Sequence, residues 1–273
     1  MAGQRWPDCE PPVAAFLQRV VDELRDDLGD ELVGVYLHGS LALGSYYPPK
    51  SDLDLLVLVR RALDVAERER ASRLFVRLSE DRPTLGDVEV SFVTEHAART
   101  FEHPMPFEVH YGCSWNDRIA AGDVDYAENR RDPDLAAHVS SVRESGVALA
   151  GPPPPEVFAP VPQADFLDSI LGDLEWICED ENILESPYYG VLNACRVLMV
   201  LADRGRRVPS KEEGALWALE NLPEEHHAVI RAALEAYRSP EPVNEEDRKT
   251  GGRTWGREGL LAFRDFVRPR RLR

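Results

Sequence analysis

Two aspartates stand at the start of a strongly apolar run in this chain. Asp52 and Asp54 open the segment SDLDLLVLV, which is apolar throughout after the second aspartate. Side chains two residues apart on a strand point the same way, so the two carboxylates would project side by side. Such a pair is costly at the edge of a buried strand unless a positive partner sits on it. Mg²⁺ suits the pair because it takes carboxylate oxygens and keeps positions free for water and phosphate.

Groups that could hold a phosphate come before this pair. The apolar segment LVGVYLH runs into Gly39 and Ser40, which can offer backbone N–H groups and a hydroxyl at the start of the next turn. A third carboxylate, Glu89, lies in DVEVSFVT, where strand alternation places it opposite the apolar side chains. If this strand pairs beside SDLDLLVLV, Glu89 joins the two aspartates. Three carboxylates, two Mg²⁺ ions and a phosphate cradle would make a phosphoryl-transfer site for a nucleoside triphosphate. His38, just before Gly39, is interpreted as a packing residue at a strand end.

The elements that must position these residues alternate between helix and strand in the first half of the chain. Apolar spacing predicts a helix over residues 11–28 that begins at Pro11-Pro12, and a second helix in AERERASRLFVRLSE. FEVHYG is expected to form a short fourth strand, and residues 134–149 a helix.

Proline marks the best domain boundary. Residues 151–155 read GPPPP, and four prolines in a row cannot lie inside a helix or a central strand. We expect a stiff extended spacer there. Beyond it the apolar period is helical throughout, in five segments: ADFLDSILGDLEWICEDENIL, SPYYGVLNACRVLMVLADRG, KEEGALWALENL, EEHHAVIRAALEAYR and GREGLLAFRDFVRP. Residues 239–253 are expected to be a polar loop. The fold class predicted is α+β: a mixed-sheet domain over 1–150, a linker over 151–156 and an all-helical bundle over 157–273.

The order of Gly39-Ser40, a spacer of about ten residues and S-D-x-D entering an apolar strand resembles the nucleotidyltransferase superfamily of the DNA-polymerase-beta-like fold. SPYYGVLNACRVLMVLADRG followed by VPSKEEGALWALENLP is similar to the helical domain of the aminoglycoside adenylyltransferases that modify streptomycin and spectinomycin. The similarity covers about residues 30 to 240. It implies that AMP is transferred from Mg-ATP to the 3''-hydroxyl of streptomycin, the 9-hydroxyl of spectinomycin, or both, which confers resistance.

The same resemblance implies roles for single residues. Asp52 and Asp54 would be Mg²⁺ ligands, and Glu89 the catalytic base close to metal and drug. Gly39, Ser40 and Ser51 would lie by the phosphates with Asp52 and Asp54. Arg196 and Lys211, delivered from the second domain, would neutralise the triphosphate on closure.

Two features depart from the family pattern in the part that would recognise the drug. Trp115 in FEVHYGCSWND stands one position later than the family tryptophan, and is either a core residue or a drug ligand. The acidic run CEDENILESPYY is out of register, so Glu179, Asp180, Glu181 and Glu185 are all candidate drug ligands. Spectinomycin is therefore the more secure expectation and streptomycin the less secure one.

Composition limits the alternatives. A formal net charge of −17 and a pI near 4.9 disfavour nucleic acid as a partner and suit a cationic one. The four cysteines are scattered without C-x-x-C, and no signal peptide or membrane-spanning run is evident. We expect a monomer in a reducing cytoplasm, without membrane contact. Two alternatives stay open: an adenylyltransferase for another small molecule or a protein, and an inactive nucleotide-binding regulatory protein.

Overall fold

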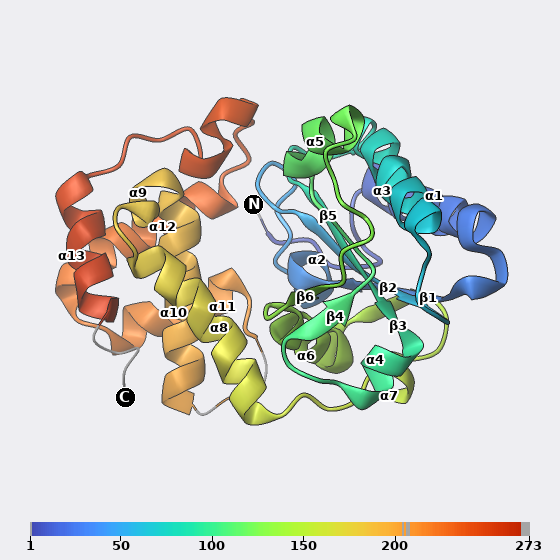
Figure 1. Cartoon of the computed structure of the whole chain (residues 1–273). Helices are drawn as coiled ribbons and strands as arrows, with labels where there is room; N and C mark the ends of the chain where they lie inside the picture. Colours follow the sequence, from blue (N-terminus) through green and yellow to red (C-terminus); the bar gives the residue numbers. More distant parts are fainter. Residues whose placement is uncertain (1, 204, 206–207, 269–273) are drawn as a thin grey trace.

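The computed structural model describes residues 2–203, 205 and 208–268. The chain forms a half built on a β-sheet and a half built of helices, which lie side by side (Figure 1). Every helix in these ranges is too short or too polar to span a bilayer.

A mixed five-stranded sheet forms the centre of the first half. Its strand order is β5-β3-β2-β1-β7, with β2 and β3 parallel and the other neighbours antiparallel. The strands run over Leu32–His38 (β1), Leu53–Val59 (β2), Val88–Thr94 (β3), Val109–Tyr111 (β5) and Val147–Ala150 (β7). A separate pair joins β4 (Met105–Phe107) to β6 (Arg130–Asp132). The mixed sheet expected from the sequence is therefore confirmed.

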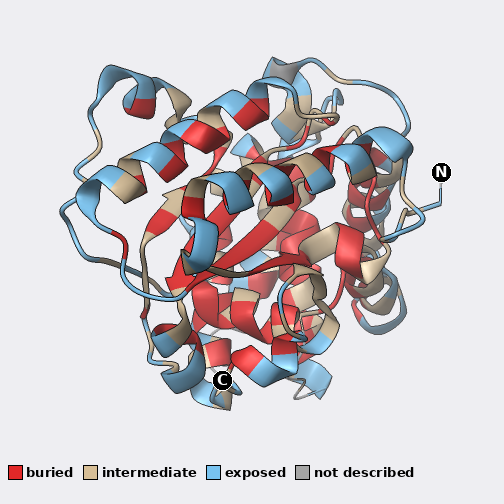
Figure 2. Cartoon of the chain, turned by 90° about the vertical axis from the view of Figure 1, so that its right-hand side faces the viewer, coloured by how far each residue is buried: buried red, intermediate tan, exposed pale blue. Residues whose placement is uncertain are grey.

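Helices cover both faces of this sheet. On one face α1 (Pro11–Leu28) and α3 (Val65–Glu80) pack their apolar sides onto the strands, and on the other face lie α4 (Glu95–Thr100), α6 (Leu135–Ser145) and α7 (Pro154–Val157). Figure 2, which looks onto this half, shows buried strands between helices whose outer faces are exposed. The short helices α2 (Gly39–Leu43) and α5 (Asn116–Ala121) lie at the sheet's ends.

The predicted helix over 134–149 is wrong in its last turn. The helix ends at Ser145, and Val147–Ala150 pairs with β1 as an edge strand. Gly146 makes this turn possible, because a Cβ there would lie 2.4 Å from the carbonyl oxygen of Val142. The β-branched Val147 follows, and from there the chain pairs with the edge of β1.

The proline run does not form an extended spacer. Pro154 starts the single-turn helix α7, where the missing N–H of proline is no loss. Pro154, Val157 and Phe158 are buried, and the last two pack with the sheet half. The chain passes to the helical half only after Phe158.

The helical half surrounds one buried helix. The helix α10 (Pro187–Asp203) packs against α8, α11, α12 and α13. These neighbours run over Gln163–Cys178 (α8), Lys211–Asn221 (α11), His227–Arg238 (α12) and Arg257–Val267 (α13), with a short α9 over Asn182–Glu185 and 3-10 turns at Glu224–His226 (η3) and Glu245–Thr250 (η4). The long helix predicted from residue 164 to 184 breaks after Cys178, because Asp180 has a left-handed backbone (φ 36°).

Candidate active site

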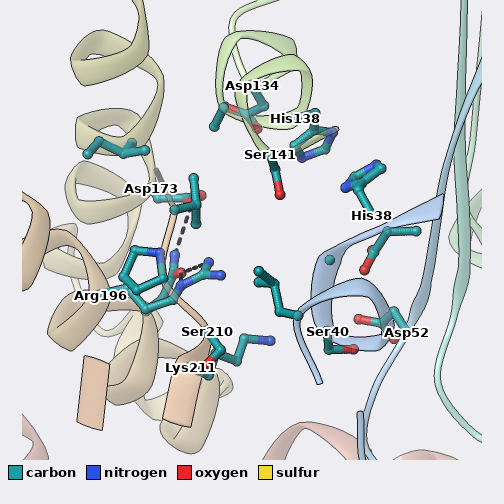
Figure 3. A pocket seen from close by; sticks show the side chains of 18 of the residues that line it. His38, Ser40, Asp52, Asp134, His138, Ser141, Asp173, Arg196, Ser210 and Lys211 are labelled. Carbon is teal, nitrogen blue, oxygen red and sulfur yellow. Dashed lines mark hydrogen bonds between the residues drawn. The ribbon is translucent and has the colours of Figure 1, made fainter. Parts of the chain in front are cut away.

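A cavity of about 310 Å³ lies between the two halves. Its wall includes residues from the ends of β1, β2 and β3 and from α6 on one side, and from α8, α10 and α11 on the other (Figure 3). Eight residues singled out in the sequence line it: Gly39, Ser40, Ser51, Asp52, Asp54, Glu89, Arg196 and Lys211.

Strand pairing brings the carboxylates together. In the parallel register of β2 and β3, Asp54 is the direct partner of Glu89, and on the other side Asp54 pairs with His38 of β1. Burial and the neighbouring Asp52 raise the pKa of Asp54 to about 6. Burial, Asp54 and Asp52 raise the pKa of Glu89 to about 8. Both shifts have the direction expected of crowded carboxylates that lack a cation.

The carboxylates fit an open magnesium site. No three His, Cys, Asp or Glu side chains within the described ranges already form a closed ligand set. Mg²⁺ does not need a closed ligand set, because it is usually held by one or two carboxylates, with water and phosphate completing its coordination shell. Asp52, Asp54 and Glu89 would supply the protein's share.

The turn after β1 is shaped for a phosphate. Gly39 has φ 64°, and a Cβ there would lie 1.8 Å from Oδ2 of Asp54, so a side chain at position 39 would collide with the carboxylate. The Oγ of the next residue, Ser40, is buried and has no hydrogen-bond partner among the described residues. A phosphate oxygen is a partner that this hydroxyl could take.

Two cations face the carboxylates from the helical half. Arg196 of α10 donates from Nε to Oδ1 of Asn193 (2.8 Å), which fixes its guanidinium. Lys211 of α11 has its Nζ 4.8 Å from the ring centroid of Tyr189, and burial together with Arg196 lowers its pKa. Close packing brings the two together: a Cβ at Gly214 would lie 2.8 Å from the backbone nitrogen of Arg196.

A third group on the wall is acidic and was not singled out in the sequence. Asp132 and Asp134 come just before α6, and Asp173 of α8 lines the cavity on the side of Arg196 (Figure 3). Burial, Asp173 and Asp132 raise the pKa of Asp134 to about 6. His138 of α6 stands beside this group, its ring centroid 5.0 Å from that of His38.

The five residues named from sequence register as candidate drug ligands are not among the described residues that line the cavity: Trp115, Glu179, Asp180, Glu181 and Glu185. Trp115 packs against the core of the sheet half, with the guanidinium of Arg118 4.7 Å from its ring centroid. Of the two interpretations left open for Trp115, this packing supports the core residue. Tryptophan has a large apolar surface to bury, and here the sheet core takes it.

The acidic run turns toward the last helix instead of the cavity. The backbone carbonyl of Asp180 accepts from Arg264, and the carboxylate of Glu181 pairs with Arg257; both arginines belong to α13. Glu185 is exposed at the end of α9. The break after Cys178 redirects the run, so its position in the sequence beside α10 gives no access to the cavity.

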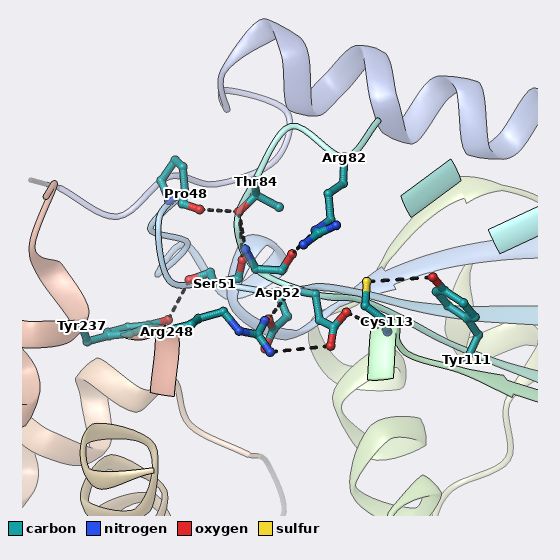
Figure 4. A network of polar contacts seen from close by, with 11 residues as sticks. Pro48, Ser51, Asp52, Arg82, Thr84, Tyr111, Cys113, Tyr237 and Arg248 are labelled. Atoms are coloured by element: carbon teal, nitrogen blue, oxygen red, sulfur yellow. Dashed lines mark hydrogen bonds and ion pairs between the residues drawn. The ribbon is translucent and has the colours of Figure 1, made fainter. Parts of the chain in front are cut away.

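Polar contacts join the two halves beside the cavity (Figure 4). The buried hydroxyl of Tyr237 donates to the carbonyl of Ser45 (2.7 Å) and lies 3.2 Å from Oγ of Ser51. Arg248, from the segment expected to be only a polar loop, contacts Asp52. The predicted phosphate-side residue Ser51 is therefore also part of the interface between the halves.

The fold and this arrangement of carboxylates, phosphate turn and cations define a nucleotidyltransferase. Residues 17–104 match the family described as nucleotidyltransferase domain, and residues 156–252 match aminoglycoside adenylyltransferase, C-terminal domain. The chain is 31% identical over 246 residues to an aminoglycoside (3'') (9) adenylyltransferase of Klebsiella pneumoniae, covering 86% of this chain and 87% of the relative. The chain belongs to the aminoglycoside adenylyltransferase family and is an enzyme of the nucleotidyltransferase class.

Two further relatives carry spectinomycin in their names. A spectinomycin 9-adenylyltransferase of Staphylococcus aureus is 26% identical over 218 residues, covering 79% of this chain and 81% of the relative. The crystal structure of the spectinomycin adenyltransferase AAD(9) from Enterococcus faecialis with ATP and spectinomycin superposes with a TM-score of 0.77 at 20% identity. It covers 95% of this chain and 99% of that one, which supports the fold.

Proposed function

We propose that this enzyme transfers AMP from Mg-ATP to a hydroxyl of spectinomycin, streptomycin or both, and so inactivates the drug. One observation carries the proposal: a single cavity is lined by Asp52, Asp54 and Glu89 with the Gly39-Ser40 turn, by the cations Arg196 and Lys211 of the helical half, and by the acidic residues Asp132 and Asp134 of the sheet half. ATP and a cationic drug need opposite charges, and this cavity offers both. The names of the relatives point to the same pair of substrates.

The nucleotide would lie along the floor. Gly39 and Ser40 would receive phosphate oxygens, and Lys211 with Arg196 would neutralise the charge that develops on the leaving pyrophosphate. Mg²⁺, when bound by Asp52 and Asp54, would neutralise phosphate charge and orient the α-phosphate.

Glu89 is placed to act as the base. Burial, Asp54 and Asp52 raise its pKa to about 8 without a cation, and Mg²⁺ on the neighbouring aspartates would lower it, so that Glu89 is ionised and able to accept a proton near neutral pH. Glu89 would accept the proton of the drug hydroxyl while that oxygen forms a bond to the α-phosphorus. The bond from the α-phosphorus to the bridging oxygen breaks in line, and pyrophosphate leaves with that oxygen.

We assign drug recognition to Asp132 and Asp134, which we call the acidic wall. Spectinomycin and streptomycin are cationic near neutral pH, and each charge-assisted hydrogen bond to a carboxylate contributes roughly 1.5–3 kcal/mol. Asp134 and Asp132 can receive the drug's cationic groups on the side away from Lys211. Asp173 also faces this space, but it accepts a hydrogen bond from Asn193 (2.8 Å), which in turn holds Arg196.

The remaining assignments follow from the reaction. ATP as a substrate and four free cysteines fit a cytoplasmic enzyme. Both walls of the cavity come from one chain, so a monomer suffices.

A pyrophosphate-release assay tests the proposal. With ATP and Mg²⁺, purified enzyme should release pyrophosphate only when spectinomycin or streptomycin is added, and EDTA should stop the release. A panel of other aminoglycosides and a bacterial protein extract serve as comparisons. Release with a compound outside the two drugs, and with neither of them, would reassign the substrate.

A further inference from the structure

Arg248, a residue of the helical half, contacts Asp52 and Asp87 of the sheet half from outside the cavity. Arg248 lies in η4, and its Nη1 is 3.2 Å from Oδ1 of Asp52, while its Nη2 is 3.7 Å from Oδ2 of Asp87 (Figure 4). The side chain of Arg248 is only 27% exposed, so its ion pair with Asp52 is partly desolvated and is not an ordinary surface pair.

The guanidinium of Arg248 and a backbone N–H both contact the same carboxylate oxygen of Asp52. The N–H of Asp87 also donates to Oδ1 of Asp52, at 2.6 Å. Asp87 is held in turn, because its Oδ1 accepts from the backbone N–H of Cys113 (2.8 Å). Both contacts of Asp52 use Oδ1, so its carboxylate is oriented while Oδ2 can be offered to a cation.

The loop that carries Arg248 is built onto the helical half. The indole Nε1 of Trp255 donates to the carbonyl of Thr250 (2.8 Å), and Arg253 donates to the carbonyl of Ala232 in α12 (3.0 Å). Gly251, with φ 66°, packs so closely that a Cβ would lie 3.2 Å from Cβ of Ala236. The position of Arg248 therefore depends on the position of α12 and of the helical half.

We propose that Arg248 is a positioning residue that orients Asp52 for Mg²⁺ and makes assembly of the metal site depend on how the helical half is seated. The same seating brings Lys211 and Arg196 to the triphosphate, so the metal ligand and the phosphate cations are set together. This inference rests on the proposed function only for the identity of the Mg-nucleotide.

The test compares Arg248→Ala and Arg248→Lys with Lys249→Ala. The control lysine is the next residue of η4, and it is exposed and takes no part in the contacts that hold the loop to the helical half. Titration calorimetry would follow binding of an ATP analogue with a methylene group between the α- and β-phosphorus, which cannot react. The titration is repeated over a series of Mg²⁺ concentrations and in EDTA.

We expect Arg248→Ala to need about tenfold more Mg²⁺ for half-maximal analogue binding, Arg248→Lys to be intermediate, and Lys249→Ala to match wild type. Binding in EDTA should be equal in all four proteins. In an Asp52→Asn background, Arg248→Ala should have no further effect. If Arg248→Ala fails to fold by thermal unfolding, Arg248→Lys alone decides, with a rise of at least about threefold expected.

Several results contradict the inference. An unchanged Mg²⁺ requirement would make Arg248 a structural tie only. A lower requirement would make it a competitor for the metal. A loss of equal size in EDTA would mean that Arg248 acts on the nucleotide directly. Wild-type enzyme that fails to bind the Mg-analogue overturns the proposed function as well, whereas normal wild-type binding with an unaffected variant overturns this inference alone.

Discussion

Asp54 of β2 and Glu89 of β3 are direct register partners on two parallel strands at the centre of the sheet. Their separation is set by backbone hydrogen bonds of buried strands and not by a mobile loop. The pairing therefore holds two acidic groups together where burial, Asp54 and Asp52 raise the pKa of Glu89, and burial with Asp52 raises the pKa of Asp54. A site held this way is ready for a cation before one arrives.

Asp54→Asn should lower AMP transfer by at least about a hundredfold, since one metal ligand is lost and each tenfold corresponds to roughly 1.4 kcal/mol of barrier. The unfolding temperature without metal should stay equal or rise, because a repulsion is removed. Initial rates and thermal unfolding measure the two effects. Asp26→Asn, an exposed aspartate on α1, is the control. A rate within tenfold of wild type would remove Asp54 from the metal site.

Lys211→Ala should weaken ATP binding by about tenfold or more and leave drug binding nearly unchanged. A lysine beside a polyanion contributes by charge, so the wild-type affinity for ATP should also fall with added salt more steeply than that of the variant. Lys249→Ala is the matched control, because Lys249 is exposed on η4. Equal ATP titrations for the two variants would show that Lys211 does not face the triphosphate.

Asp134→Asn should raise the drug KM without changing the ATP KM, because Asp134 belongs to the sheet half, whereas the cations Arg196 and Lys211 belong to the helical half. The double variant Asp180→Asn, Glu181→Gln is the control, since neither residue is among the described residues that line the cavity and the Glu181 carboxylate pairs with Arg257 of α13. Asp173 is unsuitable for this test because it is linked through Asn193 to Arg196. A drug KM that rises only in the double variant would return drug recognition to the acidic run.

Drug affinity should fall as the pH drops through about 6. The pKa of Asp134 is raised, so the folded enzyme protonates this carboxylate near pH 6 and loses a charge-assisted contact. The stability effect has the opposite sign: folding disfavours the ionised form, so Asp134→Asn should gain stability over wild type as pH rises from about 4 to 6, and the gain should be constant above. Calorimetry with drug and thermal melts from pH 4 to 8 would follow both. Parallel pH profiles for the two proteins would exclude this role.

Tyr237→Phe should destabilise the protein by about 1–2 kcal/mol, because the buried hydroxyl bridges the halves through Ser45 and Ser51. Tyr126→Phe is a matched control, since the hydroxyl of Tyr126 has no hydrogen-bond partner within the described ranges. Denaturant unfolding gives both values. If both substitutions cost the same, the bridge contributes nothing measurable.

The meeting of Asp52, Asp54 and Glu89 at one cavity could be predicted from sequence because local rules determine it. Alternation on a strand places Asp52 with Asp54 and turns Glu89 away from the core, and only one parallel pairing was needed to unite them. The positive φ at Gly39 follows from the same strand-to-turn pattern. The fold class followed from the change of apolar period along the chain.

The rest depended on contacts that the sequence does not encode locally. Asp180 takes a left-handed backbone that breaks a helix of unbroken apolar period, which moves the acidic run to α13. Asp132 and Asp134 repeat the D-x-D spacing at a turn, where such pairs are usually solvated. Their spacing therefore did not indicate that they line the cavity. Arg248 reaches Asp52 across 196 residues of chain, and nothing in its polar surroundings indicates that partner.

The most direct test is mass spectrometry of the drug after reaction. Wild-type enzyme with ATP and Mg²⁺ should convert spectinomycin, streptomycin or both to a product heavier by one AMP, with one pyrophosphate released for each product. Glu89→Gln should bind the unreactive ATP analogue like wild type yet form almost no product. Unmodified drugs in the wild-type reaction, or a Glu89→Gln enzyme that forms product at the wild-type rate, would contradict AMP transfer by this site.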